Sequence, residues 1–327
     1  MHAVVGVFSP SEAWTLPRQY LDQLRRDFPQ HTFTDVWTRD DLKRVFPDAD
    51  VAFAAYVERD LPAMLTRTRW IQVPAAGVAH VLSPDLIASP IIVTSARGVR
   101  AHAIAEHVLA SVLALARQLH TAVRRQVEHR WALDELESGG LMRTLHGRRL
   151  TVVGLGSIGS EVARLASAFG MRVSAVRKRV DQPVPDGVDE VFPPDRLAEL
   201  LARSDVVVLS AALTSDTRHL MDDAAFHALK PGALLVNIGR GRLVDDEALV
   251  AALKDGRAAG AALDVFTREP LDPASPYWDL PNVLITPHVS GAMEDYWTPL
   301  VALFSENLRR FEAGETLINV VDKVAGY

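Results

Sequence analysis

The 327-residue sequence contains no cysteine. That absence excludes disulfide bonds, thiolate metal sites and cysteine nucleophiles, and it fits a reducing cytoplasm, where we expect the protein to act. Asparagine never occurs in the Asn-x-Ser/Thr pattern of N-glycosylation. No apolar run approaches the roughly 18 residues that a membrane-spanning helix needs. We therefore expect no association with membranes.

Charge of one sign does not dominate the sequence either. The formal net charge is −6, with 23 % charged and 48 % hydrophobic residues, a balance typical of globular proteins. Because no broad basic face follows from this composition, nucleic acid is not expected as a partner. The apolar segment at residues 3–8 is too short for a secretory signal and predicts a buried strand.

Short β-rich apolar runs alternate with helical patterns along most of the sequence, which is typical of an α/β fold with parallel sheets covered by helices. In the N-terminal part, strands are expected at 3–8, 32–36, 50–54, 69–73 and 91–93. A second series of strands is expected at 149–154, 172–176, 205–209, 233–237, 259–264 and 283–286. The helices of that series are expected to begin near Ser157, Asp195, Asp222 and Asp245.

Two further segments have helical patterns. One extends from Ala101 to Val123, and the other from Met293 to Phe311. The apolar residues that place one face of the first helix in the core are Ile104, Val108, Leu109, Val112, Leu115 and Leu119. We expect the last helix to pack back on the N-terminal domain. The prediction is therefore two Rossmann-like or flavodoxin-like domains, 1–99 with 291–327 and 100–290, and a ligand-binding cleft between them.

A glycine-rich turn, Gly-Leu-Gly-Ser-Ile-Gly, lies between the predicted strand at 149–154 and a helical pattern. Strand before and helix after are the context in which this motif binds dinucleotides rather than merely turning the chain. The first glycine permits the tight turn, the second lets the backbone approach a pyrophosphate, and the third allows close helix–strand contact. The N–H groups at the helix start favour anions. The residues predicted to bind the cofactor here are Gly154, Gly156, Ser157, Ile158 and Gly159.

The second strand of such a unit normally ends in Asp or Glu, which binds the adenosine ribose. Here the predicted strand 172–176 is followed by Arg177, Lys178 and Arg179. A carboxylate would repel a 2′-phosphate, whereas Arg177 can pair with it through a charge-assisted bond of about 1.5–3 kcal/mol. The alternative is a solvated basic loop. Because the acid is missing where bases are present, the sequence predicts NADP(H) in preference to NAD(H).

The chain resembles the D-2-hydroxyacid dehydrogenase family, which includes glyoxylate/hydroxypyruvate reductases and D-lactate-type dehydrogenases. The resemblance covers essentially the whole length. Its motifs are the glycine turn, Leu-Val-Asn-Ile-Gly-Arg-Gly at 235–241, Ala-Leu-Asp-Val-Phe at 262–266 with Glu-Pro-Leu at 269–271, and Thr-Pro-His-Val-Ser-Gly at 286–291. By analogy with the family, we expect a homodimer formed with the help of residues 120–149.

The resemblance implies that Arg240 binds the substrate, that Glu269 is an acidic partner, and that His288 is the acid/base. A 2-oxo acid offers a carboxylate and a carbonyl in one plane, which suits a guanidinium with two parallel N–H donors. Hydride attack on C2 creates an alkoxide that needs a proton, for which histidine is the natural donor. Each of the three could also be an ordinary loop residue. All three are predicted at the carboxyl ends of parallel strands, where α/β sheets bind ligands.

The resemblance also implies supporting contacts. Asp264 would meet the nicotinamide carboxamide, and backbone groups around Ala212, Ile238 and Gly291 would line the cofactor cleft. The loop at 73–78 resembles the family segment whose N–H groups hold the substrate carboxylate. The residues expected to bind the substrate are Ala76, Gly77, Arg240, Tyr56 and Trp297, although aromatic residues such as the last two are more often part of a core.

The leading hypothesis is an NADPH-dependent reductase that converts a small 2-oxo acid into the D-2-hydroxy acid. An alternative is a dinucleotide-sensing, corepressor-like protein without significant turnover. A formate dehydrogenase-like activity is disfavoured because those relatives carry glutamine where this chain has Glu269; phosphonate oxidation has no support in the sequence. No metal site is expected, since the spacing of His102 and His107 fits neither zinc motif, and both are interpreted as structural or interface residues. The sequence does not distinguish glyoxylate or hydroxypyruvate from bulkier acids.

Overall fold

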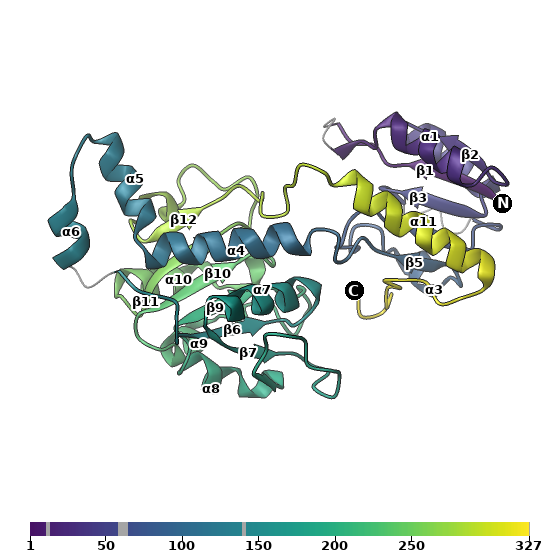
Figure 1. The fold of residues 1–327 in the computed structure, drawn as a ribbon. Helices are drawn as coiled ribbons and strands as arrows, with labels where there is room; N and C mark the ends of the chain where they lie inside the picture. The colour runs from purple at the N-terminus through teal and green to yellow at the C-terminus, as the bar shows by residue number, and fades with distance from the viewer. Residues whose placement is uncertain (11–13, 58–64, 139–141, 327) are drawn as a thin grey trace. The chain divides into compact units, whose positions relative to one another are not determined.

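The computed structural model describes residues 1–10, 14–57, 65–138 and 142–326 (Figure 1). Contacts divide the chain into two compact units, Met1–Val99 with Met293–Tyr327, and Arg100–Ala292. Each unit is an α/β domain built on a parallel sheet, which is the predicted fold class. The second boundary lies after Ala292, close to the division expected after residue 290.

The first unit contains a five-stranded parallel sheet in the order β2-β1-β3-β4-β5, which is a flavodoxin-like order. Its strands are β1 (His2–Gly6), β2 (Thr32–Asp35), β3 (Val51–Ala54), β4 (Trp70–Gln72) and β5 (Ile92–Thr94). The five predicted strands are confirmed, with ends shifted by at most two residues.

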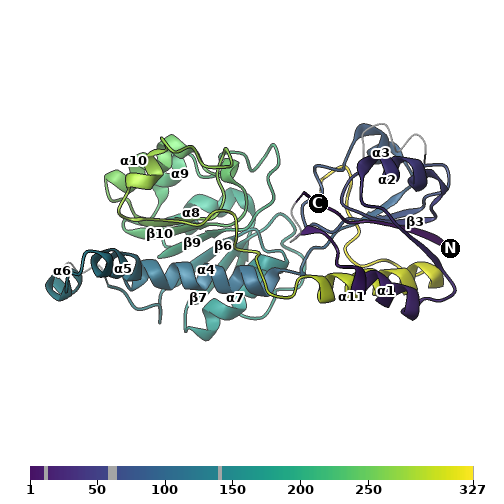
Figure 2. The ribbon, with the colours of Figure 1, turned by 90° about the horizontal axis from the view of Figure 1, so that it is seen from above.

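Helices cover both faces of this first sheet. Figure 2 shows α1 (Arg18–Asp27) beside α11 (Trp297–Ala313), and both pack on the same core cluster. On the other face lie α2 (Arg39–Val45), the 3₁₀ turn η2 (Phe46–Asp48) and α3 (Pro84–Ala88). Phe304 of α11 stacks on Phe53 and Trp70 of the sheet, with ring centroids 4.7 and 5.3 Å apart. The C-terminal helix therefore completes the core of the N-terminal unit.

The second unit contains a seven-stranded parallel sheet in the order β12-β11-β10-β9-β6-β7-β8. Its strands are β6 (Arg149–Val153), β7 (Arg172–Val176), β8 (Glu190–Phe192), β9 (Val206–Leu209), β10 (Ala233–Asn237), β11 (Ala258–Leu263) and β12 (Val283–Ile285). Six were predicted, with ends that differ by at most one residue. The short edge strand β8 was missed because its residues are only partly buried and form no apolar run.

Successive residues of the central strands alternate between two core clusters, one on each face of this sheet. One face is covered by α4 (Ala101–Ala116) and α7 (Ser157–Ala168), which pack against each other. The other face is covered by α8 (Leu197–Leu201), α9 (Asp223–Ala228) and α10 (Asp246–Lys254). The strand order reverses between β6 and β9, and in open α/β sheets that point is where ligands bind.

The expected single helical stretch from Ala101 to Val123 is wrong in one respect. The helix ends at Ala116, and a second helix, α5 (Leu119–Val127), follows, because Gln118 adopts a left-handed conformation with φ = +54°. Leu119, predicted to be buried, is 52 % exposed. All residues of α5 are at least partly exposed, and α6 (Leu133–Ser138) comes next. Among the described residues, no helix has the length and hydropathy needed to cross a bilayer.

Candidate active site

The glycine turn adopts a conformation that requires two of its glycines. Gly154 follows β6 with φ = +101°, and a Cβ atom there would lie 2.5 Å from the backbone nitrogen of Ala211. A Cβ atom on Gly159 would lie 2.3 Å from the carbonyl oxygen of Gly154. Both distances are too short for a contact between non-bonded atoms. The turn is therefore packed tightly against the end of β9 and against its own helix.

Gly156 differs from these two glycines. No atom of the described residues outside its immediate neighbours lies within 4 Å of where its Cβ would be. It is the N-cap of α7, and no described side chain caps that helix end. There is therefore open space beside Gly156, at the helix end where the N–H groups of the first turn, which include those of Ser157 and Ile158, have no side-chain cap. Such a cradle fits the pyrophosphate of a dinucleotide.

The basic residues after β7 have partners of their own. The guanidinium of Arg177 donates hydrogen bonds to the carbonyl oxygens of Gln182 and Pro183, the latter at 3.2 Å. Lys178 forms an ion pair with Asp216 at 2.7 Å, and the hydrogen bond from Lys178 holds the pKa of the Asp216 carboxyl below its usual range. The Arg177 side chain therefore binds backbone groups of its own loop in this structure. The predicted contact with a 2′-phosphate stays a prediction.

The remaining predicted cofactor residues also follow strands of the second sheet. Ile238 is buried immediately after β10. Ala212 lies after β9, and its carbonyl oxygen accepts a hydrogen bond of 2.7 Å from the Thr217 hydroxyl. A Cβ atom on Gly291 would lie 3.0 Å from Cδ of Arg100. These positions share the sheet end that carries the glycine turn.

Arg240, Glu269 and His288 lie in the loops that follow β10, β11 and β12, which are three neighbouring strands. Because these strands are parallel, the three loops leave the sheet at the same end. The sequence pattern predicted this placement from strand ends alone. Arg240 comes just before a short 3₁₀ turn, η5 (Gly241–Leu243), and is exposed.

The loop of Arg240 presses directly against the loop of Glu269. A Cβ atom on Gly241 would lie 1.9 Å from the carbonyl carbon of Phe266, so only glycine fits there. The side chain of Asn237 accepts from the Gly239 N–H at 3.1 Å and donates to the Arg240 carbonyl oxygen at 3.0 Å. Sequence reasoning missed both Asn237 and Gly241. The Gly-Arg-Gly pattern was the available signal for the second.

His288 and Glu269 form a direct contact, with Nδ1 of the imidazole 2.7 Å from Oε2 of the carboxylate. The other carboxylate oxygen, Oε1, accepts the backbone N–H of Phe266 at 2.9 Å. Because an ionised carboxylate only accepts hydrogen bonds, Nδ1 of His288 carries the proton. The second ring nitrogen, Nε2, is then the one that can exchange a proton with a ligand. The side chain of His288 is 53 % exposed, which leaves it accessible.

The loop that carries His288 is shaped by Asp264, a residue that is only 1 % exposed. Its carboxylate accepts hydrogen bonds from the Thr286 hydroxyl at 2.6 Å and from the N–H groups of Val289 and Ser290, both at 2.9 Å. Burial raises the pKa of the Asp264 carboxyl, but the hydrogen bonds from Ser290, Thr286 and Val289 outweigh it, so the pKa lies below its usual value. The predicted contact of Asp264 with nicotinamide stays a prediction.

In the first unit, the predicted substrate residues follow β3 and β4 or begin α11. Ala76 and Gly77 are exposed in the loop after β4. That loop is tied to the start of α11, because the Tyr296 hydroxyl donates to the carbonyl oxygen of Pro74. Tyr56 packs on Phe8, and Trp297 packs on Tyr296, each pair with ring centroids 5.2 Å apart. Tyr56 and Trp297 are both half-buried, as residues at the edge of a pocket would be.

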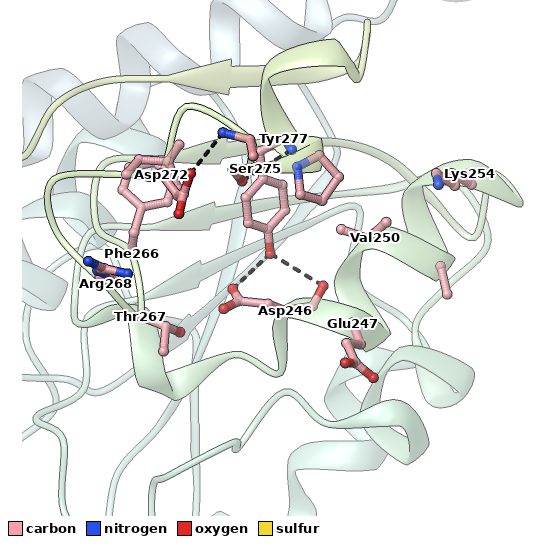
Figure 3. A pocket seen from close by; sticks show the side chains of 14 residues that line it. Asp246, Glu247, Val250, Lys254, Phe266, Thr267, Arg268, Asp272, Ser275 and Tyr277 are labelled. Carbon is pink, nitrogen blue, oxygen red and sulfur yellow. Dashed lines mark hydrogen bonds between the residues drawn. The ribbon is translucent and has the colours of Figure 1, made fainter.

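A cavity of about 710 Å³ lies elsewhere in the second unit, between α10 and the segment 266–277 (Figure 3). Tyr277 lines this cavity, and its hydroxyl donates to Oδ1 of Asp246 at 2.9 Å. Burial raises the pKa of Tyr277, and the negative charge of Asp246 raises it further. None of the predicted site residues lines this cavity. Within the ranges that the structure describes, no cluster of three or more His, Asp or Glu side chains could hold a metal ion.

Comparisons with known proteins identify relatives of this chain. Residues 109–290 match the model of the D-isomer specific 2-hydroxyacid dehydrogenase NAD binding domain. The chain is 37 % identical over 252 residues to a glyoxylate reductase of Korarchaeum cryptofilum, an alignment that covers 76 % of this chain and 74 % of that protein.

Two solved structures resemble the whole chain. One is a D-isomer specific 2-hydroxyacid dehydrogenase from Xanthobacter autotrophicus in complex with NADPH and MES, with TM-score 0.83, 30 % identity and 99 % coverage of both chains. The other is an NADPH-dependent glyoxylate/hydroxypyruvate reductase from Sinorhizobium meliloti in complex with NADP and sulfate. Its TM-score is 0.80 and its identity 28 %, and the match covers 100 % of this chain and 99 % of that one.

A Rossmann-type sheet with an open glycine cradle, joined in one chain to a second α/β domain, defines the class of two-domain NAD(P)-dependent oxidoreductases. Within that class, the chain belongs to the D-isomer specific 2-hydroxyacid dehydrogenase family. The family acts on small 2-oxo and 2-hydroxy acids.

The contrast between Gly156 and Gly159 gives a prediction about dinucleotide binding. Gly156→Ala adds a methyl group to open space, so the melting temperature should not change while the Kd for NADP⁺ rises at least about tenfold, because backbone approach is blocked. Gly159→Ala is the matched control, and overpacking there should cost about 1–3 kcal/mol of folding stability. Calorimetry and fluorescence titration measure both. Unchanged NADP⁺ affinity in Gly156→Ala would place the dinucleotide elsewhere.

Proposed function

We propose that this protein catalyses the NADPH-dependent reduction of a small 2-oxo acid to the D-2-hydroxy acid. The observation that carries the proposal is the 2.7 Å contact between His288 and Glu269 at the sheet end where Arg240 also lies. An imidazole held by a carboxylate and a guanidinium at the same end of the sheet are the groups that this reaction needs from a protein.

Arg240, Glu269 and His288 have different roles in the proposed reaction. NADPH, when bound, supplies the hydride that adds to C2 of the substrate. Arg240 binds the planar oxo acid through its guanidinium and stabilises the negative charge that develops on the carbonyl oxygen. Nε2 of His288 gives its proton to that oxygen, and the Glu269 carboxylate stabilises the imidazolium before transfer. In the oxidative direction, Nε2 takes the hydroxyl proton instead.

The first unit contributes to substrate binding in this proposal. The backbone N–H groups of Ala76 and Gly77 bind the substrate carboxylate, since both residues are exposed in a loop that Tyr296 holds in place. Tyr56 and Trp297 limit the volume open to the substrate side chain. These aromatic residues are anchored by Phe8 and Tyr296 and therefore present a fixed surface.

NADP(H) is the proposed cofactor because Arg177, Lys178 and Arg179 occupy the place after β7 where a ribose-binding acid would otherwise stand. The relatives from Xanthobacter autotrophicus and Sinorhizobium meliloti are in complex with NADPH and NADP, which supports the same choice. A 2′-phosphate would take over the hydrogen bonds that Arg177 now makes to the carbonyl oxygens of Gln182 and Pro183. Exchanging neutral acceptors for a charged one is favourable for a guanidinium.

A homodimer through α5 is also proposed. Leu119, Val123 and Val127 recur every four residues along this helix and are 52, 57 and 78 % exposed. Trp131, just after the helix, is 90 % exposed. A run of large apolar side chains on one exposed helix face is unusual on a monomer and typical of a protein interface. The family resemblance makes a second copy of this chain the expected partner.

The catalytic assignment predicts that purified protein consumes NADPH with at least one member of a panel of 2-oxo acids and gives the D-product. His288→Asn should lower kcat by about 10²–10⁴ because the general acid is lost. Asparagine tolerates the left-handed backbone of His288, which has φ = +55°, so the fold should survive. His219→Asn is the matched control, since His219 has φ = +51° and is not one of the proposed site residues. Tight NADPH binding with no turnover of any acid would instead favour a dinucleotide-sensing protein.

The cofactor assignment predicts that Arg177→Asp shifts preference from NADPH toward NADH. The ratio of the two kcat/KM values should fall by roughly ten- to a hundredfold, the contribution of one charge-assisted bond. Arg172→Asp, at the opposite end of β7, is the control and should leave the ratio unchanged. Steady-state kinetics with both cofactors provides the measurement. A ratio that Arg177→Asp does not alter would refute the role given to this arginine.

The dimer assignment predicts that light scattering gives the mass of two chains for the wild type. Val123→Glu with Val127→Glu should give one chain, because two buried charges without partners would oppose association. Val324→Glu, at an 88 % exposed position, is the control and should remain dimeric. A wild type that is monomeric at micromolar concentration would contradict the proposal.

A further inference from the structure

The long helix α4 contacts the catalytic loop through one side chain that the mechanism above does not use. Nε2 of His107 lies 3.2 Å from the hydroxyl oxygen of Thr286, two residues before His288. His107 is half-buried, and no metal-binding cluster in the described part of the chain accounts for it. Its histidine neighbour on the same helix, His102, is exposed and pairs with Glu161 of α7.

The direction of these hydrogen bonds follows from counting protons. The Thr286 hydroxyl has one proton, and its 2.6 Å contact with Oδ1 of Asp264 uses it, because an ionised carboxylate only accepts. The oxygen of Thr286 can therefore only accept from His107. Nε2 of His107 must then carry a proton. A neutral His107 ring is therefore the Nε2–H tautomer.

The chain of hydrogen bonds continues to both sides of His288. Asp264 accepts the N–H groups of Val289 and Ser290 through its carboxylate, and its carbonyl oxygen accepts the N–H of His288 at 2.9 Å. His288 has a left-handed backbone, a conformation that a non-glycine residue keeps only when its surroundings hold it. The hydrogen bond from the Thr286 hydroxyl to Asp264 is one of those constraints, and His107 contacts the same hydroxyl.

We propose that His107 is a positioning residue for His288: by donating from Nε2 to Thr286, it keeps the Thr286 hydroxyl on Asp264 and so fixes the loop that presents the catalytic imidazole. The effect on turnover rests on the proposed function, whereas the effect on the loop does not. His107 itself touches neither substrate nor the reacting atoms in this account.

The kinetic test compares His107→Leu with His107→Gln, because the glutamine amide can donate from nearly the place of Nε2 whereas leucine cannot. His107→Leu should lower kcat by about 10- to 100-fold, the effect of misplacing a catalytic group, with KM for the 2-oxo acid changed less than about threefold. His107→Gln should keep kcat within about threefold of the wild type. His102→Leu, on the same helix, is the control and should have no effect. A kcat retained by His107→Leu, or lost equally in His107→Gln, overturns the proposal.

Coupling through Thr286 supplies a second kinetic criterion. If both residues act through one hydrogen-bonded chain, then His107→Leu combined with Thr286→Val should lower kcat no further than the more damaging single change. Multiplicative losses in the double variant would mean that the two residues act separately, and would overturn the proposed chain.

A spectroscopic readout separates this proposal from the proposed function. In protein labelled with ¹⁵N-histidine, the His107 ring should give the signals of an Nε2–H tautomer. The ring signals of His288 should shift in His107→Leu and stay in place in His107→Gln and His102→Leu. A wild type that reduces no 2-oxo acid refutes the proposed function, and these spectra still test His107. His288 signals that do not respond to His107→Leu overturn the positioning role even if the wild type is active.

Discussion

The hydrogen bond between Nδ1 of His288 and Oε2 of Glu269 is the interaction on which the rest of the site depends. Without it, neither the tautomer nor the orientation of the imidazole would be defined. The bond is itself constrained, because the second oxygen of Glu269 is held by the N–H of Phe266. Because one oxygen of Glu269 accepts from His288 and the other from Phe266, the carboxylate is held in one orientation. Nε2 is then the only ring nitrogen available for chemistry.

The fold places this pair by simple means. Three neighbouring parallel strands end at one side of the sheet, and the loops after them carry the guanidinium, the carboxylate and the imidazole. Contact between the loops is so close that Gly241 has no room for a side chain against Phe266. The buried carboxylate of Asp264 then accepts hydrogen bonds from the backbone of the loop that carries the imidazole. The backbone is thus held by close contacts where the proposed catalytic groups attach, although the side chain of His288 itself is accessible.

Much of this could be predicted from the sequence, for physical reasons. Strands such as β9, residues 206–209, are continuous apolar runs, and Gly154 and Gly159 of the turn mark places where the backbone leaves no room for a side chain. Edge strand β8 and the break at Gln118 were missed, because a half-buried strand and a single left-handed residue leave no periodic signal. The partners of Arg177 and His107 were also beyond prediction. The Arg177 contacts depend on the path of its own loop as far as Pro183, and the His107 contact depends on how a helix packs against a segment distant in sequence. Sequence analysis could interpret His107 only as a structural or interface residue.

The most direct test of the account is the rate of deuterium transfer from NADPH deuterated at both C4 positions to a 2-oxo acid in a single turnover, compared between the wild type and Glu269→Gln. Glutamine offers one acceptor and one donor where the carboxylate offers two acceptors, so it can hold both Phe266 and His288 only if Nδ1 of His288 gives up its proton, and it no longer stabilises an imidazolium. The account predicts D-2-hydroxy acid with deuterium at C2 from the wild type, and a transfer rate at least about tenfold lower in Glu269→Gln with NADPH binding unchanged. Equal rates in the two proteins, or no deuterium at C2, would contradict it.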